Sequence, residues 1–244
     1  MYNALKSIVK QLIKRIILIR PELSTFYAAS TDRALYRICS RGTPVFKTVI
    51  DVGASNGCWS AMCMKHFPVA TYLLVDANEV HADALDTFCA EHPNAQRVIA
   101  AAGNQDGECM FDGSDPGGGS AYTEAVDEVD RIVPMISLDN EVERRKLCGP
   151  FLLKLDTHGF ELQILEGAKN ILRDTNLVII ESYVFRLHSK SHIFHELCTY
   201  MDSIGFLAID FSEPMWRKND MALWQFDLFF VPKHNNVFSS NSFS

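Results

Sequence analysis

Residues 48–59 read Thr-Val-Ile-Asp-Val-Gly-Ala-Ser-Asn-Gly-Cys-Trp, an apolar run that reaches an acid and then a turn with two glycines. Val49 and Ile50 are β-branched and favour a buried strand. Gly53 allows a sharp turn and the close approach of a ligand, and Gly57 begins a helix whose free amide groups face the same crevice. The stretch therefore predicts a strand, a turn and a helix that together bind a nucleoside cofactor.

The glycine spacing indicates which cofactor to expect. A dinucleotide fingerprint has the pattern G-x-G-x-x-G, which lets the backbone approach a pyrophosphate, whereas Gly53 and Gly57 give only G-x-x-x-G. A cofactor without phosphates, such as S-adenosylmethionine, fits this spacing better. A glycine turn that is merely structural is the alternative interpretation.

The composition is that of an ordinary globular protein. The 244 residues, 48% hydrophobic and 22% charged, are enough for one α/β domain with a full core. The net charge of −7 argues against a general nucleic-acid binder, which needs a basic surface. The seven cysteines form no C-x-x-C pair and no zinc spacing, so we expect a reducing, cytoplasmic setting.

The first twenty residues differ from the rest of the chain because they contain five basic residues and no acid, and their apolar residues recur at helical spacing. Their longest uninterrupted apolar run, Ile16–Ile19, is far shorter than the roughly 20 residues needed to span a bilayer. Two interpretations stay open. The helix packs on the domain or on a second copy of the chain as a homodimer contact, or it is a basic helix that touches anionic lipid at a membrane surface.

We expect three parts along the chain: an N-terminal helical appendage over residues 1–45, a main domain over 46–234 and a disordered tail over 235–244. In the main domain, strand-like runs alternate with helix-like segments, which is typical of a mostly parallel sheet with helices on both faces. The seven expected strands cover 48–52, 72–76, 97–102, 151–156, 177–180, 206–211 and 224–231, and the expected helices cover 31–39, 57–67, 79–91, 162–172 and 192–204. The last two strands are predicted to form a hairpin, so that one late strand runs antiparallel.

Acids stand at the ends of four expected strands: Asp51, Asp76, Asp156 and Glu181. Ligands of parallel sheets bind outside the carboxyl ends of the strands. Asp76 is placed to accept hydrogen bonds from both hydroxyls of a ribose, with capping of the helix near Asn78 as the alternative. Asp51 is expected to orient the glycine loop or to receive the ammonium group of the cofactor.

Two residues that follow the first strand, Asn56 and Trp59, are candidates for the methionine end of the cofactor. Trp59 suits the core side of a helix equally well.

Lys154-Leu-Asp-Thr-His-Gly-Phe-Glu161 is the second informative stretch. Lys154 and Asp156 point to the same side of a strand, where a self-neutralising ion pair is the alternative to a functional role. His158 lies just past the strand, and an ordinary histidine pKa suits a general base for a substrate hydroxyl. We expect Asp156 to orient His158 or to hold the methionine end, and Glu181 to orient His158 or to bind substrate. A divalent metal is the alternative if Asp156 and Glu181 converge, but no second carboxylate adjoins Asp156 in the sequence, so no metal site is predicted.

These segments resemble the FkbM family of S-adenosylmethionine-dependent methyltransferases over roughly residues 48–232. The resemblance rests on Ile50-Asp-Val-Gly-Ala-Ser-Asn-Gly57, Val75-Asp-Ala77, Ala101-Ala-Gly-Asn-Gln-Asp-Gly107, the stretch 154–161 with Leu165-Glu-Gly-Ala168, and Asp227-Leu-Phe-Phe-Val231. It implies a Rossmann-like class I methyltransferase fold and methylation of a hydroxyl on a sugar or a secondary metabolite. The residues expected at the cofactor are Asp51, Gly53, Ala54, Ser55, Asn56, Gly57, Trp59, Asp76, Ala77, Ala101, Ala102 and Asp156.

The chain departs from the family pattern at two places. Many members have Glu-Pro where this chain has Asp76-Ala77, a change that keeps an acceptor for the ribose. Many also have Val-Glu-Gly where this chain has Thr157-His-Gly159, so His158 indicates a subgroup with its own substrate chemistry.

The resulting hypothesis is an S-adenosylmethionine-dependent O-methyltransferase that acts on a small-molecule or glycan acceptor. A NAD-dependent oxidoreductase on the same scaffold is the first alternative, and the missing third glycine argues against it. A non-catalytic cofactor-binding module, docked to a membrane or a partner through the N-terminal helix, is the second. The walls of the acceptor site are expected from the insert 112–126, the segment 185–195 and the loop 212–220.

Overall fold

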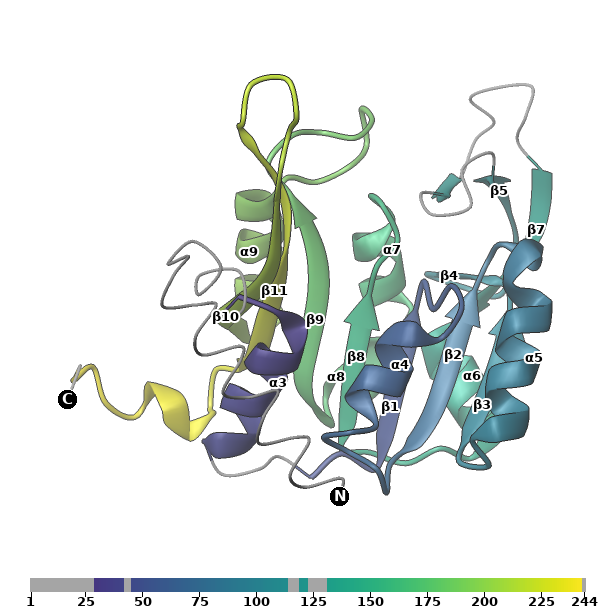
Figure 1. Cartoon of the computed structure of the whole chain (residues 1–244), viewed down its shortest axis with the longest axis horizontal. Coiled ribbons are helices and arrows are strands. Elements are labelled where there is room, and N and C mark those ends of the chain that lie inside the picture. The colour runs from purple at the N-terminus through teal and green to yellow at the C-terminus, as the bar shows by residue number, and fades with distance from the viewer. Residues whose placement is uncertain (1–28, 42–44, 114–118, 123–130, 243–244) are drawn as a thin grey trace, which may run out of the picture.

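The computed structural model describes residues 29–41, 45–113, 119–122 and 131–242. Its centre is a seven-stranded sheet with the order β10-β11-β9-β8-β1-β2-β3 (Figure 1). The strands are β1 (Thr48–Val52), β2 (Thr71–Asp76), β3 (Ala95–Ile99), β8 (Phe151–Leu155), β9 (Thr175–Tyr183), β10 (Phe206–Trp216) and β11 (Leu223–Pro232). β11 runs antiparallel to both of its neighbours, and the other neighbouring strands are parallel. The predicted sheet, with one reversed late strand, is therefore confirmed.

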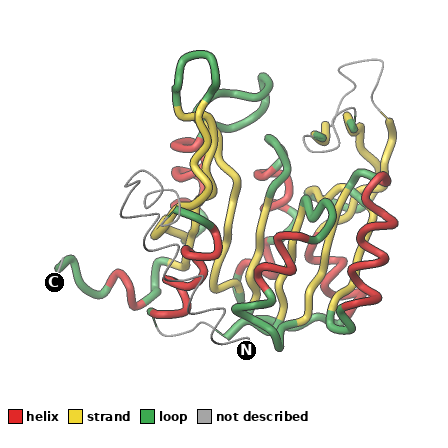
Figure 2. Tube along the Cα trace, in the orientation of Figure 1, coloured by secondary structure: helices red, strands yellow, loops and turns green. Residues whose placement is uncertain are grey.

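Helices cover both faces of this sheet (Figures 1 and 2). One face carries α3 (Thr31–Ser40), α4 (Cys58–Cys63) and α5 (Ala82–Glu91), and the other carries α6 (Leu138–Arg145), α7 (Glu161–Glu166), α8 (Lys169–Leu172) and α9 (Phe194–Ser203). Successive strand residues alternate between the two cores: Ile50 and Leu73 belong to the second of these faces, Val49 and Tyr72 to the first. Because both faces are covered, every residue of the central strands β1 and β8 is buried, and most of these residues are apolar.

Helix α3 lies inside the predicted N-terminal appendage but packs into the core of the main domain. Its residues Ala34, Leu35 and Ile38 are buried with the α4 and α5 side of the sheet. On its outer side the Arg37 guanidinium donates to both carboxylate oxygens of Asp210 on β10, at 2.8 Å each. The described part of the appendage therefore shares the core of the domain.

The predicted basic helix over the first twenty residues falls outside the described residues. None of the helices that the structure describes is long and apolar enough to cross a membrane. In the tail predicted to be disordered from residue 235, the structure has a short 3-10 helix, η2, over Asn236–Phe238.

The third strand differs from the prediction of one strand over 97–102. β3 ends at Ile99, level with the end of β2, and β4 (Ala101–Gly103) then leaves the main sheet. No β2 residue remains to pair with β4, which instead joins a second sheet of order β4-β7-β5-β6. The other members of this sheet are β5 (Gly107–Asp112), β6 (Ser120–Tyr122) and β7 (Arg131–Ser137).

The insert contains one predicted feature and two that the sequence did not predict. The residue pattern of the insert predicts two antiparallel segments, 108–111 and 120–126. In the structure β5 pairs antiparallel with β6, and residues 123–130 lie outside the described part. β7 and α6 were not predicted. Pro134 stands in the middle of β7, and a proline argues against a strand because it has no N–H to donate.

Glu181 lies within β9 and not at its end. The antiparallel strand β11 extends past the parallel ones and pairs Gln225 with Tyr183, which prolongs β9. The predicted helix over 79–91 consists of a 3-10 turn, η1 (Glu79–His81), followed by α5.

Candidate active site

A cavity lies at the carboxyl ends of β1, β2 and β8. At this point successive connections of the chain lead to opposite sides of β1. β1 has β2 on one side and β8 on the other, and such switch points are where α/β sheets bind ligands. The cavity has an empty volume of about 690 Å³, which includes open solvent at its mouth. It is lined by Val52, Gly53, Ser55, Val75, Asp76, Ala77, Asn78, His81, Ala100, Ala101, Ala102, Phe111, Gly119, Ala121, Asp156, Thr157, His158, Phe160 and Ile164.

The glycine turn after β1 is fixed between the two neighbouring strands. Gly53 has φ +78°, and a Cβ at this position would lie 2.0 Å from the carbonyl oxygen of Asp156. The amides of Gly53 and Ala54 donate to the carbonyl of Val75 at 2.9 and 3.2 Å, which ties the loop to β2. Position 53 therefore requires glycine both for its backbone conformation and for its space.

Asp76 stands at the end of β2 and holds the same loop. Its carboxylate accepts the amide of Ser55 at 2.7 Å and the amide of Asn78 at 2.8 Å. Burial raises the pKa of Asp76, and the two amide bonds oppose that shift. Each carboxylate oxygen has a further lone pair, so this group suits the two hydroxyls of a ribose.

Two residues that sequence reasoning missed, Asn78 and His81, follow Asp76 into the cavity wall. The Asn78 side-chain Nδ2 is buried and has no hydrogen-bond partner among the described residues. A nucleoside in the cavity would supply one. The sequence allowed Asn78 to be predicted at the cavity, because Asn78 follows Asp76, the acid at the end of β2, by two residues.

The cavity walls fit a cofactor with an apolar, uncharged nucleoside and no phosphates. Small alanines at 100, 101 and 102, together with Phe111, Phe160 and Ile164, form much of the lining. Among the described lining residues there is no lysine or arginine to pair with a pyrophosphate. This mainly apolar lining, with Asp76 and Asn78 as polar groups, fits S-adenosylmethionine.

Five of the residues expected at the cofactor do not line the cavity: Asp51, Ala54, Asn56, Gly57 and Trp59. Asp51 is fully buried, accepts the hydroxyl of Ser60 at 2.7 Å and pairs with Lys154 at 3.2 Å, so it fixes α4 to the sheet. Ala54 is buried, and Asn56 accepts the amide of Cys58 at 3.2 Å. These side chains shape the loop and do not face the cavity.

Gly57 and Trp59 have structural roles on α4. A Cβ at Gly57 would lie 2.7 Å from the ring of Phe88. The Trp59 ring lies 5.4 Å from the Lys154 ammonium and packs against the core on the α3 side of the sheet.

Lys154 is a buried cation between two carboxylates. Its Nζ lies 3.2 Å from Asp51 Oδ1 and 3.0 Å from Asp156 Oδ2. Burial opposes the charge, but Asp156 and Asp51 outweigh it and raise the pKa of Lys154. Burial also acts against the Asp156 carboxylate, and Lys154 reverses that effect and lowers the pKa of Asp156. The same-side placement predicted for Lys154 and Asp156 is confirmed, and Asp156 is held as a charged group.

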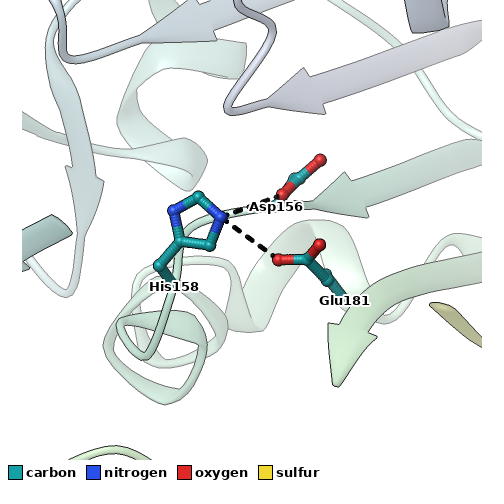
Figure 3. A group of neighbouring side chains, drawn as sticks. All are labelled: Asp156, His158 and Glu181. Carbon is teal, nitrogen blue, oxygen red and sulfur yellow. Dashed lines mark ion pairs between the residues drawn. The ribbon is translucent and has the colours of Figure 1, made fainter. Parts of the chain in front are cut away.

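The three residues expected to be catalytic come together as one group, the Asp156–His158–Glu181 cluster (Figure 3). His158 Nε2 lies 3.3 Å from Glu181 Oε2 and 3.8 Å from Asp156 Oδ1. The other ring nitrogen, Nδ1, lies 3.2 Å from the carbonyl oxygen of Gly119. Asp156 and His158 line the cavity, and Glu181 stands behind them.

The environment of His158 favours the protonated ring. Burial opposes the charge, but the hydrogen bond and charge of Glu181, with Asp156, raise the pKa of His158 to about 9. At neutral pH the ring therefore holds a proton in this arrangement, which differs from the ordinary histidine pKa assumed for a general base. The cause is the second carboxylate, Glu181, which the fold brings from β9.

Glu181 is oriented by one residue of its own strand, β9, and by one residue of the neighbouring strand, β11. The Tyr183 hydroxyl donates to Glu181 Oε2, and the Gln225 amide donates to Oε1. Gln225 could not be found from the sequence, because its approach depends on the register between β9 and β11. Asp227 is the direct cross-strand neighbour of Glu181, and burial followed by the charge of Asp156 raises the pKa of Asp227 to about 7.

The sheet order, the single reversed strand and the cavity at the switch point are those of the Rossmann-like class I methyltransferase fold. The family model described as Methyltransferase FkbM domain matches residues 51–208. The chain therefore belongs to the FkbM methyltransferase family, as the sequence resemblance implied.

Two relatives illustrate the match. Hexuronic acid methyltransferase AglP of Haloferax volcanii is 27% identical over 135 residues, which is 54% of each chain. The crystal structure of methyltransferase FkbM from Methylobacillus flagellatus KT has a TM-score of 0.54 at 14% identity, and the match covers 84% of this chain and 48% of that one. The chain thus spans about half the length of these relatives, and the structural likeness concerns the fold.

Proposed function

We propose that the protein transfers a methyl group from S-adenosylmethionine to a hydroxyl group of a sugar-type acceptor. The observation that carries this proposal is the position of the Asp156–His158–Glu181 cluster at the edge of the nucleoside cavity. A relative named as a hexuronic acid methyltransferase supports a sugar-type acceptor.

When bound, S-adenosylmethionine supplies an electrophilic methyl group on its sulfonium. Asp76 and Asn78 are the residues proposed to hold the ribose, and the loop at Gly53 lets the backbone approach the cofactor. Asp156 lies across the cavity from Asp76 and marks the side on which the acceptor enters. Alignment of the two reactants at about 3–3.5 Å supplies a large part of the rate, on the order of 7–11 kcal/mol in favourable cases.

The cluster is proposed to position the acceptor hydroxyl and to assist the loss of its proton. His158 serves as a base only in the fraction of molecules in which its ring is neutral. With a pKa of about 9, that fraction is roughly one in a hundred at neutral pH.

Aromatic side chains lie next to the cluster and pack on one another. The Tyr183 ring lies 6.2 Å from that of His158 and 5.9 Å from that of Trp224. Trp224 in turn stacks on Phe185 at 5.6 Å. These three aromatic residues form a path from His158 toward the loop ends of β9 and β11, and we assign the acceptor to this side.

A transfer assay with labelled S-adenosylmethionine tests this proposal. Oligosaccharides that carry a uronic acid, matched neutral oligosaccharides and a phenolic acceptor are compared. We expect transfer to the sugars and little to the phenol. The variant His158→Ala is expected to lower the transfer rate at least tenfold while affinity for S-adenosylhomocysteine stays within about twofold.

His66→Ala is the matched control, because His66 also pairs with a carboxylate, Asp32, but lies outside the cavity. This control should keep the full rate. Transfer to the phenol alone would contradict the sugar acceptor, and an unchanged rate in His158→Ala would remove His158 from the reaction.

A further inference from the structure

We propose that the Asp156–His158–Glu181 cluster binds a divalent metal ion of the first transition row, such as Mn²⁺, at the edge of the cofactor cavity. The site itself rests on the geometry of three side chains. Its task, to hold the hydroxyl of the acceptor, rests on the proposed function.

The three side chains converge as metal ligands do (Figure 3). One ligand atom from each residue lies within 4.8 Å of the other two, and Nε2 is 3.3 Å from Glu181 Oε2 and 3.8 Å from Asp156 Oδ1. Ligands that each stand about 2.0–2.2 Å from one ion lie roughly 3–4 Å from one another. Small side-chain adjustments therefore suffice to surround an ion.

The orientation of His158 is that of a metal-binding histidine. Its Nδ1 lies 3.2 Å from the carbonyl oxygen of Gly119. Because a carbonyl oxygen only accepts hydrogen bonds, Nδ1 carries the hydrogen in this contact. In the neutral ring this places the lone pair on Nε2, which faces two carboxylate oxygens. Without an ion, a proton on Nε2 stands between the nitrogen and the two oxygens, and a metal ion would replace that proton. Histidines that bind metals usually donate their other ring N–H to a carbonyl or carboxylate in this way.

Neighbouring side chains hold both carboxylates so that one oxygen faces the histidine; in Glu181 that oxygen, Oε2, is also the one that accepts the Tyr183 hydroxyl. Lys154 contacts Oδ2 of Asp156 and leaves Oδ1 on the His158 side. Tyr183 and Gln225 donate to Glu181 and fix its plane. Outer partners of this kind position metal ligands and tune their affinity.

The positive charge of Lys154 does not neutralise both carboxylates of the cluster. Its ammonium is shared between Asp156 and the fully buried Asp51, at 3.0 and 3.2 Å. No ion pair of Lys154 with Glu181 is present in the described structure. Asp227 adds a further carboxylate beside Glu181. A divalent cation would balance the two ligating carboxylates.

The sequence left a metal at Asp156 and Glu181 as an alternative only, because no second carboxylate adjoins Asp156 in the chain. The parallel pairing of β8 with β9 supplies that carboxylate from a strand about 25 residues further on, since Leu155 pairs with Ile180 and the next residues are Asp156 and Glu181. One imidazole and two carboxylates suit Mn²⁺ better than Mg²⁺, which prefers oxygen ligands. Three protein ligands leave positions open for water and for the acceptor hydroxyl, whose proton is then lost more readily to the solvent.

Mn²⁺ titration followed by electron paramagnetic resonance tests the site, with the full chain first treated with chelator. We expect one tightly bound Mn²⁺ per chain, and at least tenfold weaker binding in Glu181→Gln. His66→Gln, which alters a histidine–carboxylate pair outside the cavity, should bind Mn²⁺ as the wild type does. Binding of S-adenosylhomocysteine to each variant shows that it is folded.

Absence of bound Mn²⁺ in the wild type, or equal binding in Glu181→Gln, would overturn the metal site. Methyl transfer at the full rate in chelator together with no Mn²⁺ binding would sink the site and leave the proposed function standing. Specific Mn²⁺ binding in a protein that binds no S-adenosylhomocysteine would support the site and contradict the proposed function.

Discussion

His158 carries its charge through contacts that exist only in the folded chain. Because the pKa of His158 is raised to about 9, its protonated form stabilises the fold fully below the unfolded pKa of about 6.5. This contribution, on the order of 3 kcal/mol, is lost as the pH rises through about 9.

Urea unfolding in the presence of chelator, for the wild type and His158→Gln, measures this contribution. The stability difference between the two proteins should be larger at pH 6 than at pH 9.5. A difference that stays constant across this range would show that His158 is neutral in the folded protein.

Gly53 is the residue on which the loop geometry depends most directly. In Gly53→Ala the new methyl group meets the carbonyl of Asp156, so the loop must move away from β8. We expect at least tenfold weaker binding of S-adenosylhomocysteine, measured by calorimetry. Gly205→Ala is the matched control, since Gly205 also has a positive φ, +94°, but has open space around it. It should lose about 1 kcal/mol of stability and keep its affinity. Equal effects in the two variants would point to backbone strain alone.

At the scale of single residues, the sequence predicts the site best where a polar or charged residue stands at the end of a strand. The acids Asp76 and Asp156 lie in the cavity as expected, because strand ends in a parallel sheet share one edge. Gln225 and Gly119 were not predictable, since one depends on a strand register and the other on the course of an insert. Asp51 is a strand acid that the structure buries under α4, and its position in the sequence does not distinguish it from the others.

Among the elements, α3 tests whether the segment before residue 46 belongs to the domain. Leu35 is fully buried on α3, and its neighbour Tyr36 is 53% exposed. Leu35→Ala should lower the free energy of unfolding by about 2–5 kcal/mol, and Tyr36→Ala should change it by less than about 0.5 kcal/mol. Urea unfolding distinguishes the two variants. A neutral Leu35→Ala would mean that α3 is a detachable appendage.

Element prediction failed mainly where pairing depends on distant strands. The apolar run over 98–102 does not show that β2 ends level with Ile99, so the break between β3 and β4 cannot be predicted from the sequence. The length of β9 likewise depends on β11, which pairs with it as far as Tyr183. The core strands β1 and β8 were predictable because they are buried on both faces and consist of continuous apolar residues, apart from the charged pair Asp51 and Lys154.

For the whole molecule, the order of the strands is what brings the site together. β1 lies between β2 and β8, so a loop that follows one strand contacts Asp76 from the second and Asp156 from the third. β9 then adds Glu181 beside Asp156. The cavity and the cluster are thus two parts of one edge of the sheet, which is the arrangement needed to bring a methyl donor and an acceptor together.

Binding of S-adenosylhomocysteine by calorimetry tests this account most directly. The wild type should bind one S-adenosylhomocysteine per chain and should not respond to NAD. Asp76→Asn should bind at least tenfold more weakly, because it removes the carboxylate proposed to hold the ribose, a loss of about 1.4 kcal/mol or more. Asp86→Asn, which alters an exposed carboxylate paired with Arg97, should bind as the wild type does. Tight binding of NAD without any response to S-adenosylhomocysteine, or equal affinity in Asp76→Asn and the wild type, would contradict the account.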